Sequence, residues 1–442
     1  MYKILLTMLC VSSFIAKADW ADAIQAFEAA KYQRAETEFK KLIEVGNDLA
    51  AFNLAAMAYH GQGQPANLVK AVAYFMLAAE LGHKSAGNLA TQLAEKFTVA
   101  EQQLVRQQLL LLQDEVAIPK LITKQPADEK AAPQVLKRVN PKYPSDAARA
   151  GRFGYVNLRI FVDEDGTVQS VDTLDAFPKG VFEKESIRAV KRWRYEAGTE
   201  KHIQQVRLDF TLDGEVNVDN FRATLVDNKI WEYAVAGLPA YQEALGTMLE
   251  MVSMFSRNDF DVDKGSKLTA DLPDLSVFSA KPVVNITLPD FEGRAWVKVA
   301  SDGKISQAKY IHNPKGAEAK QLIGVEVSEK LTPGRYALKS YTMNDHLRVA
   351  VSALNVIPES LTSGYWWEVA ARNGDKRAQQ IMAVKSSIWE RYLIAQQDPV
   401  VMAWSGSKLI LDGNREEGLA LLDQAIALNY PQATELKKQF NE

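Results

Sequence analysis

The sequence predicts an α+β multidomain protein in which a small antiparallel sheet with helices is flanked by α-helical repeats. Apolar and polar residues alternate on both sides of Asp165-Gly166, a pair typical of a two-residue hairpin turn. Gly46 with Ala50 and Gly82 with Ala86 repeat one helix-end junction at a period typical of stacked helix pairs. A chain of 442 residues also exceeds the usual size of one domain, so several domains are expected.

The central α+β unit is predicted element by element. A short helix opens at Pro144-Ser145, and two strands, at 156–162 and 167–174, flank the hairpin turn. Apolar residues then recur at helical spacing over 182–193. A third strand at 203–212 alternates again, which completes the order helix, hairpin, helix, strand.

This order resembles the C-terminal domain of TonB energy-transducing proteins. The residues that carry the resemblance are Tyr143-Pro144, Asp165-Gly166 and the segment AVKRWRY at 189–195. We place the TonB-like domain at 133–215. The resemblance implies that the domain binds the N-terminal segments of outer-membrane transporters by accepting them as an added strand.

The last strand of such a sheet lies at an edge, where unpaired backbone groups can accept an extended peptide. Val206 and Leu208 are predicted to face the core, whereas Gln205, Arg207 and Asp209 are predicted to face away from it. These five residues are the candidate partner-binding site. In the alternative, the chain's own helices cover this edge.

Helical repeats are predicted on both sides of the central unit. Residues 50–82 resemble a Sel-one-like repeat, a relative of the tetratricopeptide repeat, within a repeat region at 22–116. Weaker copies of the same junction, in which glycine or asparagine ends one helix and alanine lets the next approach closely, mark a second region at 362–442. The junctions there are Gly374 with Ala378 and Asn429 with Ala433.

Three further segments complete the predicted organisation. Spaced prolines indicate a linker at 117–132, and apolar residues at helical spacing indicate a helical connector at 228–270. Residues 281–357 are predicted to hold a divergent second copy of the TonB-like domain, because 293–336 echoes 154–198. Asp302-Gly303 and Pro314-Lys315-Gly316 stand where the first copy has Asp165-Gly166 and Pro178-Lys179-Gly180. Coincidence is the alternative, since both are common turn signals.

The N-terminus has the pattern of a secretory signal peptide. Lys3 precedes an apolar run at 4–15, and Ala16-Lys17-Ala18 supplies the small residues that signal peptidase requires. We predict a signal peptide at 1–18, cleavage after Ala18 and a periplasmic location, which suits a mature chain that has lost Cys10. The alternative is an uncleaved anchor in the inner membrane that leaves the protein facing the periplasm, although such a run spans only about 18 Å as a helix.

Composition argues against several functional classes. A formal charge of −3 gives no basic surface for nucleic acid. The five histidines do not fall at the spacings of metal sites, and no serine or cysteine nucleophile motif is present, so neither metal, cofactor nor enzymatic activity is predicted. Gly61, Gly63 and Ala66 follow a helix rather than a strand, so they are interpreted as a repeat loop and not as a dinucleotide site.

The leading hypothesis is a periplasmic protein-binding or adaptor protein that captures extended peptide segments by strand addition. Its partners would be proteins, and the resemblance implies N-terminal segments of outer-membrane transporters. The alternative is a TonB-type energy transducer that couples the proton-motive force to transport by outer-membrane receptors. The mature chain lacks the membrane helix and the long proline-rich spacer that such a transducer uses, so the adaptor is preferred.

Overall fold

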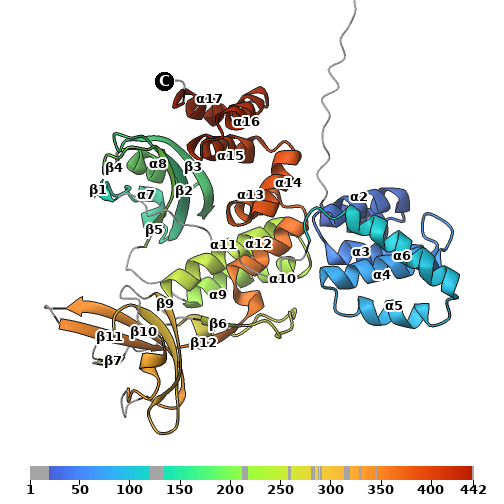
Figure 1. Ribbon diagram of the computed structural model, residues 1–442, viewed down its shortest axis with the longest axis horizontal. Helices are drawn as coiled ribbons and strands as arrows, with labels where there is room; N and C mark the ends of the chain where they lie inside the picture. The colour runs from blue at the N-terminus through green and yellow to red at the C-terminus, as the bar shows by residue number, and fades with distance from the viewer. Residues whose placement is uncertain are drawn as a thin grey trace, which may run out of the picture. The chain divides into compact units, whose positions relative to one another are not determined.

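The computed structural model describes most of the chain, which folds into two compact units (Figure 1). The described residues are 19–119, 134–211, 218–256, 260–279, 284–286, 288, 291–312, 319–327, 331–343 and 346–440. The predicted signal peptide, its cleavage site at Ala18 and most of the predicted linker lie outside these residues.

The first unit gathers the described part of residues 1–125 with 237–239 and 370–379. Its helices are α1 (Trp20–Glu28), α2 (Tyr32–Glu44), α3 (Asp48–His60), α4 (Leu68–Leu81), α5 (Ala86–Ala94) and α6 (Val99–Asp114). Gly82 ends α4 in the left-handed conformation, as the junction pattern predicts, and Gly61 ends α3 in the same conformation. Thr98 and Glu101 form a capping box that begins α6.

Residues 370–379 belong to this first unit although they are distant from it in the sequence. The Arg372 guanidinium donates to the carbonyl oxygens of Val45, Gly46 and Ile118, at 2.9, 3.0 and 3.2 Å. Asn47 donates from Nδ2 to Oδ1 of Asn373 at 2.7 Å while its own Oδ1 caps α3. One arginine therefore satisfies carbonyls at the end of α2, where a helix leaves them without partners.

The second unit contains a three-stranded antiparallel sheet in the order β3-β2-β5. Its strands are β2 (Gly154–Val162), β3 (Val168–Phe177) and β5 (His202–Phe210), with the helices α7 (Ser145–Arg149) and α8 (Glu183–Val190). Figure 1 shows α8 lying across one face of this sheet. Gly166 takes a φ of +79° in the hairpin turn, and a Cβ there would lie 2.1 Å from the Tyr195 oxygen, so only glycine fits.

Two details of this sheet differ from the sequence prediction. α8 ends at Val190 rather than continuing to Trp193, because Arg194–Tyr195 (β4) instead pairs with Val135–Lys137 (β1). Trp193 is still buried, and its Nε1 donates to the Val139 carbonyl at 2.9 Å. The third strand ends at Phe210, and Leu212, predicted to extend it, lies outside the described residues.

The core of this small domain lies on the α8 side of the sheet. The side chains on that side of β2 are Val156, Leu158, Ile160 and Val162, all buried. They pack with Phe182, Val190 and Trp193 from the α8 region. The alternation predicted from the sequence is therefore the alternation between the two faces of the sheet.

The next part of the second unit contains helices and two short strands. Its elements are α9 (Val218–Asp227), α10 (Ile230–Val235), α11 (Pro239–Phe255), β6 (Phe260–Asp263), η1 (Leu275–Phe278), β12 (Asn355–Pro358), η3 (Glu359–Leu361) and α12 (Ser363–Arg372). The predicted helical connector at 228–270 is thus incomplete, since β6 is extended and pairs in parallel with β12. Trp366 and Trp367 are both buried, with indole nitrogens that donate to Ser360 and Thr247.

A second, five-stranded antiparallel sheet lies between β6 and β12 in the sequence, in the order β7-β11-β10-β8-β9. Its elements are β7 (Val284–Ile286), β8 (Arg294–Val299), β9 (Ile305–His312), the 3₁₀-helix η2 (Ala319–Leu322), β10 (Gly334–Met343) and β11 (His346–Ala353). Its core includes Val297, Leu338, Val349 and Val351.

The C-terminal helices are α13 (Lys376–Lys385), α14 (Ser387–Ala395), α15 (Pro399–Leu411), α16 (Arg415–Ala427) and α17 (Pro431–Lys438). α15 and α16 approach each other closely at Gly406 and Gly418, where an added Cβ on Gly406 would lie 2.6 Å from the Gly418 oxygen. Their apolar core includes Trp404, Leu422 and Phe440 and extends to Phe161 of β2. These helices therefore pack against the face of the small sheet that α8 leaves open.

Candidate functional site

β5 lies at one edge of the three-stranded sheet, as the sequence predicts for its last strand. It pairs antiparallel with β2 from Gly154↔Phe210 to Val162↔His202. Among the hydrogen bonds of the described residues, none joins the β5 backbone to anything but β2. Within the described part of the chain, the amides and carbonyls on the outer side of β5 thus have no backbone partner.

The five candidate residues alternate between the two faces of the sheet. Val206 and Leu208 point to the α8 side, where they pack half-buried against the core. Arg207 and Asp209 lie on the other face and form an ion pair, with 2.8 Å between Nε and Oδ1. Gln205 lies on this face too and is exposed. The structure thus brings all five together on one strand and gives each the orientation predicted from the sequence.

Arg207 has contacts outside β5 in addition to its ion pair with Asp209. Its guanidinium lies 4.0 Å from the centre of the Tyr155 ring, close enough for a cation–π interaction. Its Nη1 lies 3.5 Å from Oε1 of Glu250 on α11. Burial and the nearby carboxylate of Asp175 raise the pKa of Tyr155, which keeps the phenol neutral beside the guanidinium.

The chain's own C-terminal helices cover the outer face of the sheet but not its β5 edge. Phe161 of β2 is fully buried and meets Phe440 edge to face, with 5.3 Å between ring centres. Ile203 at the start of β5 packs against the same cluster. Among the described residues, the C-terminal helices therefore pack against the face of the sheet, and no backbone group pairs with the outer side of β5.

A polar cluster joins the sheet to α15 beneath this cover. Trp404 donates from Nε1 to Oδ2 of Asp172 on β3 at 3.1 Å, and the same oxygen lies 3.4 Å from Nη2 of Arg159 on β2. The Arg159 guanidinium stacks over the Trp404 ring at 4.4 Å. Burial lowers the pKa of Arg159, and Asp172 opposes this shift. The Asp172 carboxylate is therefore the direct counter-charge of a buried cation.

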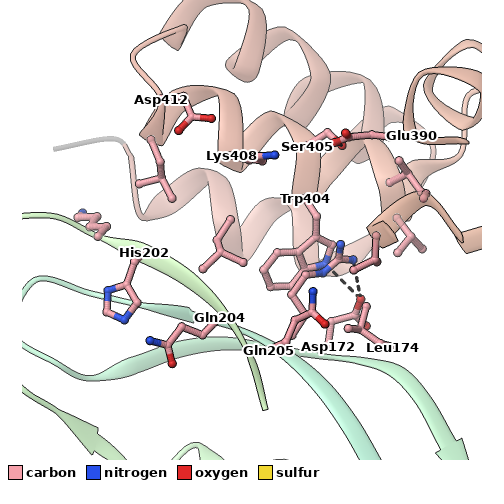
Figure 2. A pocket seen from close by; sticks show the side chains of 18 of the residues that line it. Asp172, Leu174, His202, Gln204, Gln205, Glu390, Trp404, Ser405, Lys408 and Asp412 are labelled. Atoms are coloured by element: carbon pink, nitrogen blue, oxygen red, sulfur yellow. Dashed lines mark hydrogen bonds and ion pairs between the residues drawn. The ribbon is translucent and has the colours of Figure 1, made fainter. Parts of the chain in front are cut away.

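A cavity of about 960 Å³ opens between this face of the sheet and α13–α15, beside the first half of β5. Figure 2 shows Gln205 and Asp172 on the sheet side, with Trp404, Ser405 and Lys408 opposite them on α15. The wall of the cavity includes side chains of both charge signs, for example Lys408 and Glu390. A space of this size can hold side chains from a segment that passes along β5.

The described residues offer no centre for catalysis by a metal. No group of three or more histidine, cysteine, aspartate or glutamate side chains among them could hold an ion. In the same part of the chain, no helix combines the length and the apolar character that crossing a bilayer requires. The features found around β5 are main-chain groups at a sheet edge and a cavity beside them.

His202 at the start of β5 should make the stability of the protein depend on pH. Burial lowers the pKa of its imidazole below the usual value, so the unfolded chain takes up a proton at a higher pH than the folded chain does. Stability present above about pH 6.5 should be lost as the pH falls towards the folded-state pKa. We expect His202→Gln to reduce the drop in melting temperature between about pH 7.5 and about pH 5.5.

The matched control for this measurement is His60→Gln, which changes an exposed histidine on α3. This control should keep the full difference in melting temperature between the two pH values. An equal difference in the wild type and in His202→Gln would show that His202 does not carry the effect.

Sequence reasoning did not find Arg159, Asp172 or Trp404. Arg159 and Asp172 sit at polar positions of alternating strands, where side chains are expected to face water. Asp172 and Trp404 are 232 residues apart, and no local pattern connects them. The cluster becomes visible only when the C-terminal helices are placed on the sheet.

In the described part of the chain, the small domain is a three-stranded antiparallel sheet with a helix on one face and a last strand, β5, that pairs only with β2. Comparison with known proteins finds a family that is similar to this small domain. Residues 139–213 match the family model described as the Gram-negative bacterial TonB protein C-terminal. This segment is similar to TonB C-terminal domains, as its sequence motifs predict.

Individual relatives match over the same part of the chain. Protein TonB of Escherichia coli (strain K12) is 34% identical over 88 residues, which are 20% of this chain and 37% of that protein. Protein TonB of Yersinia enterocolitica is 37% identical over 65 residues, 15% of this chain and 26% of that protein. The chain thus spans about a third or less of the length of these curated relatives.

A solved structure is also similar in this segment. It is the solution NMR structure of the Pseudomonas aeruginosa TonB CTD, which is 22% identical, with a TM-score of 0.18. The match covers 92% of that chain and 20% of this one.

Proposed function

We propose that this protein is a TonB-type binding or adaptor protein that captures an extended peptide segment as a fourth strand beside β5. The observation that carries the proposal is the open β5 edge. Its backbone pairs on one side alone among the described residues, while Val206 and Leu208 stay half-buried beside it. An added strand would bond to the outward backbone groups and cover these two apolar side chains.

The proposed partners are proteins of the outer membrane. The similarity to TonB C-terminal domains supports the N-terminal segments of transporters as ligands. A periplasmic location follows from the predicted signal peptide. The cavity beside β5 supports the same proposal, since it offers space for side chains of a segment that passes along the strand.

The second candidate is an energy transducer of the TonB type, which the 34% identity to Protein TonB favours. The two candidates differ in where the mature protein resides. Fractionation of native cells separates them, because an adaptor is expected in the periplasmic fraction with its first 18 residues removed. Recovery of uncleaved protein from the inner membrane would favour the transducer.

Proline substitutions in β5 test strand capture. Gln205 and Val206 are neighbours, so their amides point to opposite sides of the strand. Proline removes one amide donor in each variant. We expect one of Gln205→Pro and Val206→Pro to lose about tenfold or more in peptide affinity with little change in stability, because its lost donor faces outward. The other should mainly destabilise the β2–β5 pairing.

The measurement uses the mature full-length chain and a synthetic peptide with the N-terminal segment of an outer-membrane transporter. Titration calorimetry gives the affinity, and urea unfolding gives the stability of each variant. The neighbouring proline serves as the matched control, because it differs only in the side of the strand that loses a donor. Unchanged peptide affinity in both variants would rule out strand addition at β5.

A further inference from the structure

The second sheet repeats the connectivity of the TonB-like sheet. In the first, the β2–β3 hairpin is followed by α8 and then by β5, which returns to pair with β2. In the second, the β8–β9 hairpin is followed by η2 and then by β10, which returns to pair with β8. Both sheets therefore contain the same three-strand order, β3-β2-β5 and β9-β8-β10.

The two hairpin turns also share their hydrogen bonds. The closing bonds are Asp163 N–H to the Thr167 oxygen and Ala300 N–H to the Lys304 oxygen, both 2.9 Å long. Gly166 and Gly303 take the same φ of +79°. An isolated antiparallel bridge follows each turn, and these bridges are Thr167↔Arg194 and Lys304↔Glu326. The closing bond and the glycine φ follow from a shared turn type, whereas the bridge after each turn is a further similarity.

The strand registers agree as well. The pair Leu158↔Val206 in the first sheet corresponds to Ala295↔Leu338 in the second. Each residue of β8 differs from its counterpart in β2 by the same number of positions in the sequence. A second constant difference relates β10 to β5, and it also relates Glu326 to Arg194. A shorter connection after the hairpin accounts for the gap between these two values.

The two sheets differ at the edge of their third strand. β10 continues into β11, which pairs along its outer side with Leu338↔Val351 and Ser340↔Val349. Leu338, which corresponds to Val206, is only 1% exposed, because Val349 and Val351 complete the core beside it. Val206 has no such neighbour among the described residues and stays half-buried.

We propose that residues 294–353 are a self-completed copy of the capture domain, in which β11 takes the place that a captured strand takes beside β5. β5 then selects strands patterned like β11, with β-branched apolar side chains at two alternate positions on the α8 side. This inference rests on the proposed strand capture. β11 runs antiparallel to β10 because a short hairpin connects the two strands. The inference for β5 therefore concerns the side-chain pattern of the captured strand and not its direction.

Self-completion also limits the number of capture edges. The outer backbone groups of β10 already bond to β11, so they cannot accept a peptide. Of the two corresponding strands, only β5 should therefore capture a peptide.

A peptide with the β11 sequence, HLRVAVSA, tests this inference on the mature full-length protein. The matched control has the same composition with its two valines adjacent, so that only one valine can face the α8 side. We expect the β11 peptide to slow amide hydrogen exchange in β5, to leave β10 unchanged and to bind about tenfold more tightly than the control.

Three outcomes would overturn the inference. Equal affinity of the two peptides at β5 would contradict the predicted side-chain pattern but would not contradict strand capture itself. Protection of β10 would show that its edge is not closed. Protection of β5 by a transporter segment but not by the β11 peptide would also reject the pattern, whereas failure of every peptide would reject the proposed function itself.

Discussion

Replacement of Asp172 by alanine should destabilise the protein by about 3–5 kcal/mol, because it leaves the buried Arg159 guanidinium without its counter-charge. Arg159 is enclosed between β2 and α15, and its side chain is 13% exposed. The same substitution removes the acceptor of the Trp404 indole nitrogen, which lies 3.1 Å from Oδ2. The Arg159 guanidinium and the Trp404 indole N–H would both remain buried without these partners, and each loss lowers the free energy of unfolding.

Urea unfolding of the single variant and of a double variant measures this effect. In Arg159→Met with Asp172→Asn, the cation is absent and the asparagine oxygen can still accept from Trp404. We expect the double variant to recover most of the lost stability, since neutral replacement of a buried ion pair is often close to neutral in free energy. Equal destabilisation of the two proteins would show that the charge of Arg159 is not the cause.

The sequence predicts the small sheet well because the information is local. Alternation places Val206 and Leu208 on one face and Arg207 on the other, and the Asp-Gly turn fixes the hairpin. The edge position of β5 follows from the order of elements, together with the resemblance to TonB C-terminal domains. These features need no knowledge of the remainder of the chain.

The cover on the outer face could not be predicted in this way. Phe161 has the sequence context of an ordinary strand position, and its partner Phe440 is near the other end of the chain. Strand β6 was missed for a similar reason, since four residues that pair with distant β12 give no periodic signal. Long-range pairing decides both features, and a single sequence does not display it.

The filled edge of the second sheet was also beyond sequence reasoning. The echo of 154–198 in 293–336 ends before β11 begins, so it contains no hint of a fourth strand. Val349 and Val351 look like one more alternating strand, and their role depends on the register with β10. The resemblance between the two segments predicts a shared fold, while the pairing of β10 with β11 lies beyond the segments that resemble each other.

Replacement of Phe161 by alanine should cost about 3–5 kcal/mol and should loosen the C-terminal helices from the sheet. Phe161 is fully buried and belongs to the apolar cluster of α15–α17, whereas the α8-side core lies on the opposite face of β2. Amide hydrogen exchange should therefore accelerate in α15–α17 more than in α8. Trp193→Ala is the matched control, since it removes a large buried side chain from the α8-side core.

The Phe161 variant also separates two roles of the small sheet, which are the proposed capture of a peptide at β5 and the packing against the C-terminal helices. The proposed peptide capture uses the outward backbone of β5 together with Val206 and Leu208, which lie on the α8 side. Phe161→Ala should thus retain most of its affinity for a captured peptide while its C-terminal helices exchange faster. Unchanged exchange in α15–α17 would contradict the packing argument. Loss of capture together with faster exchange would instead mean that the cavity walls formed by these helices supply most of the affinity for the peptide.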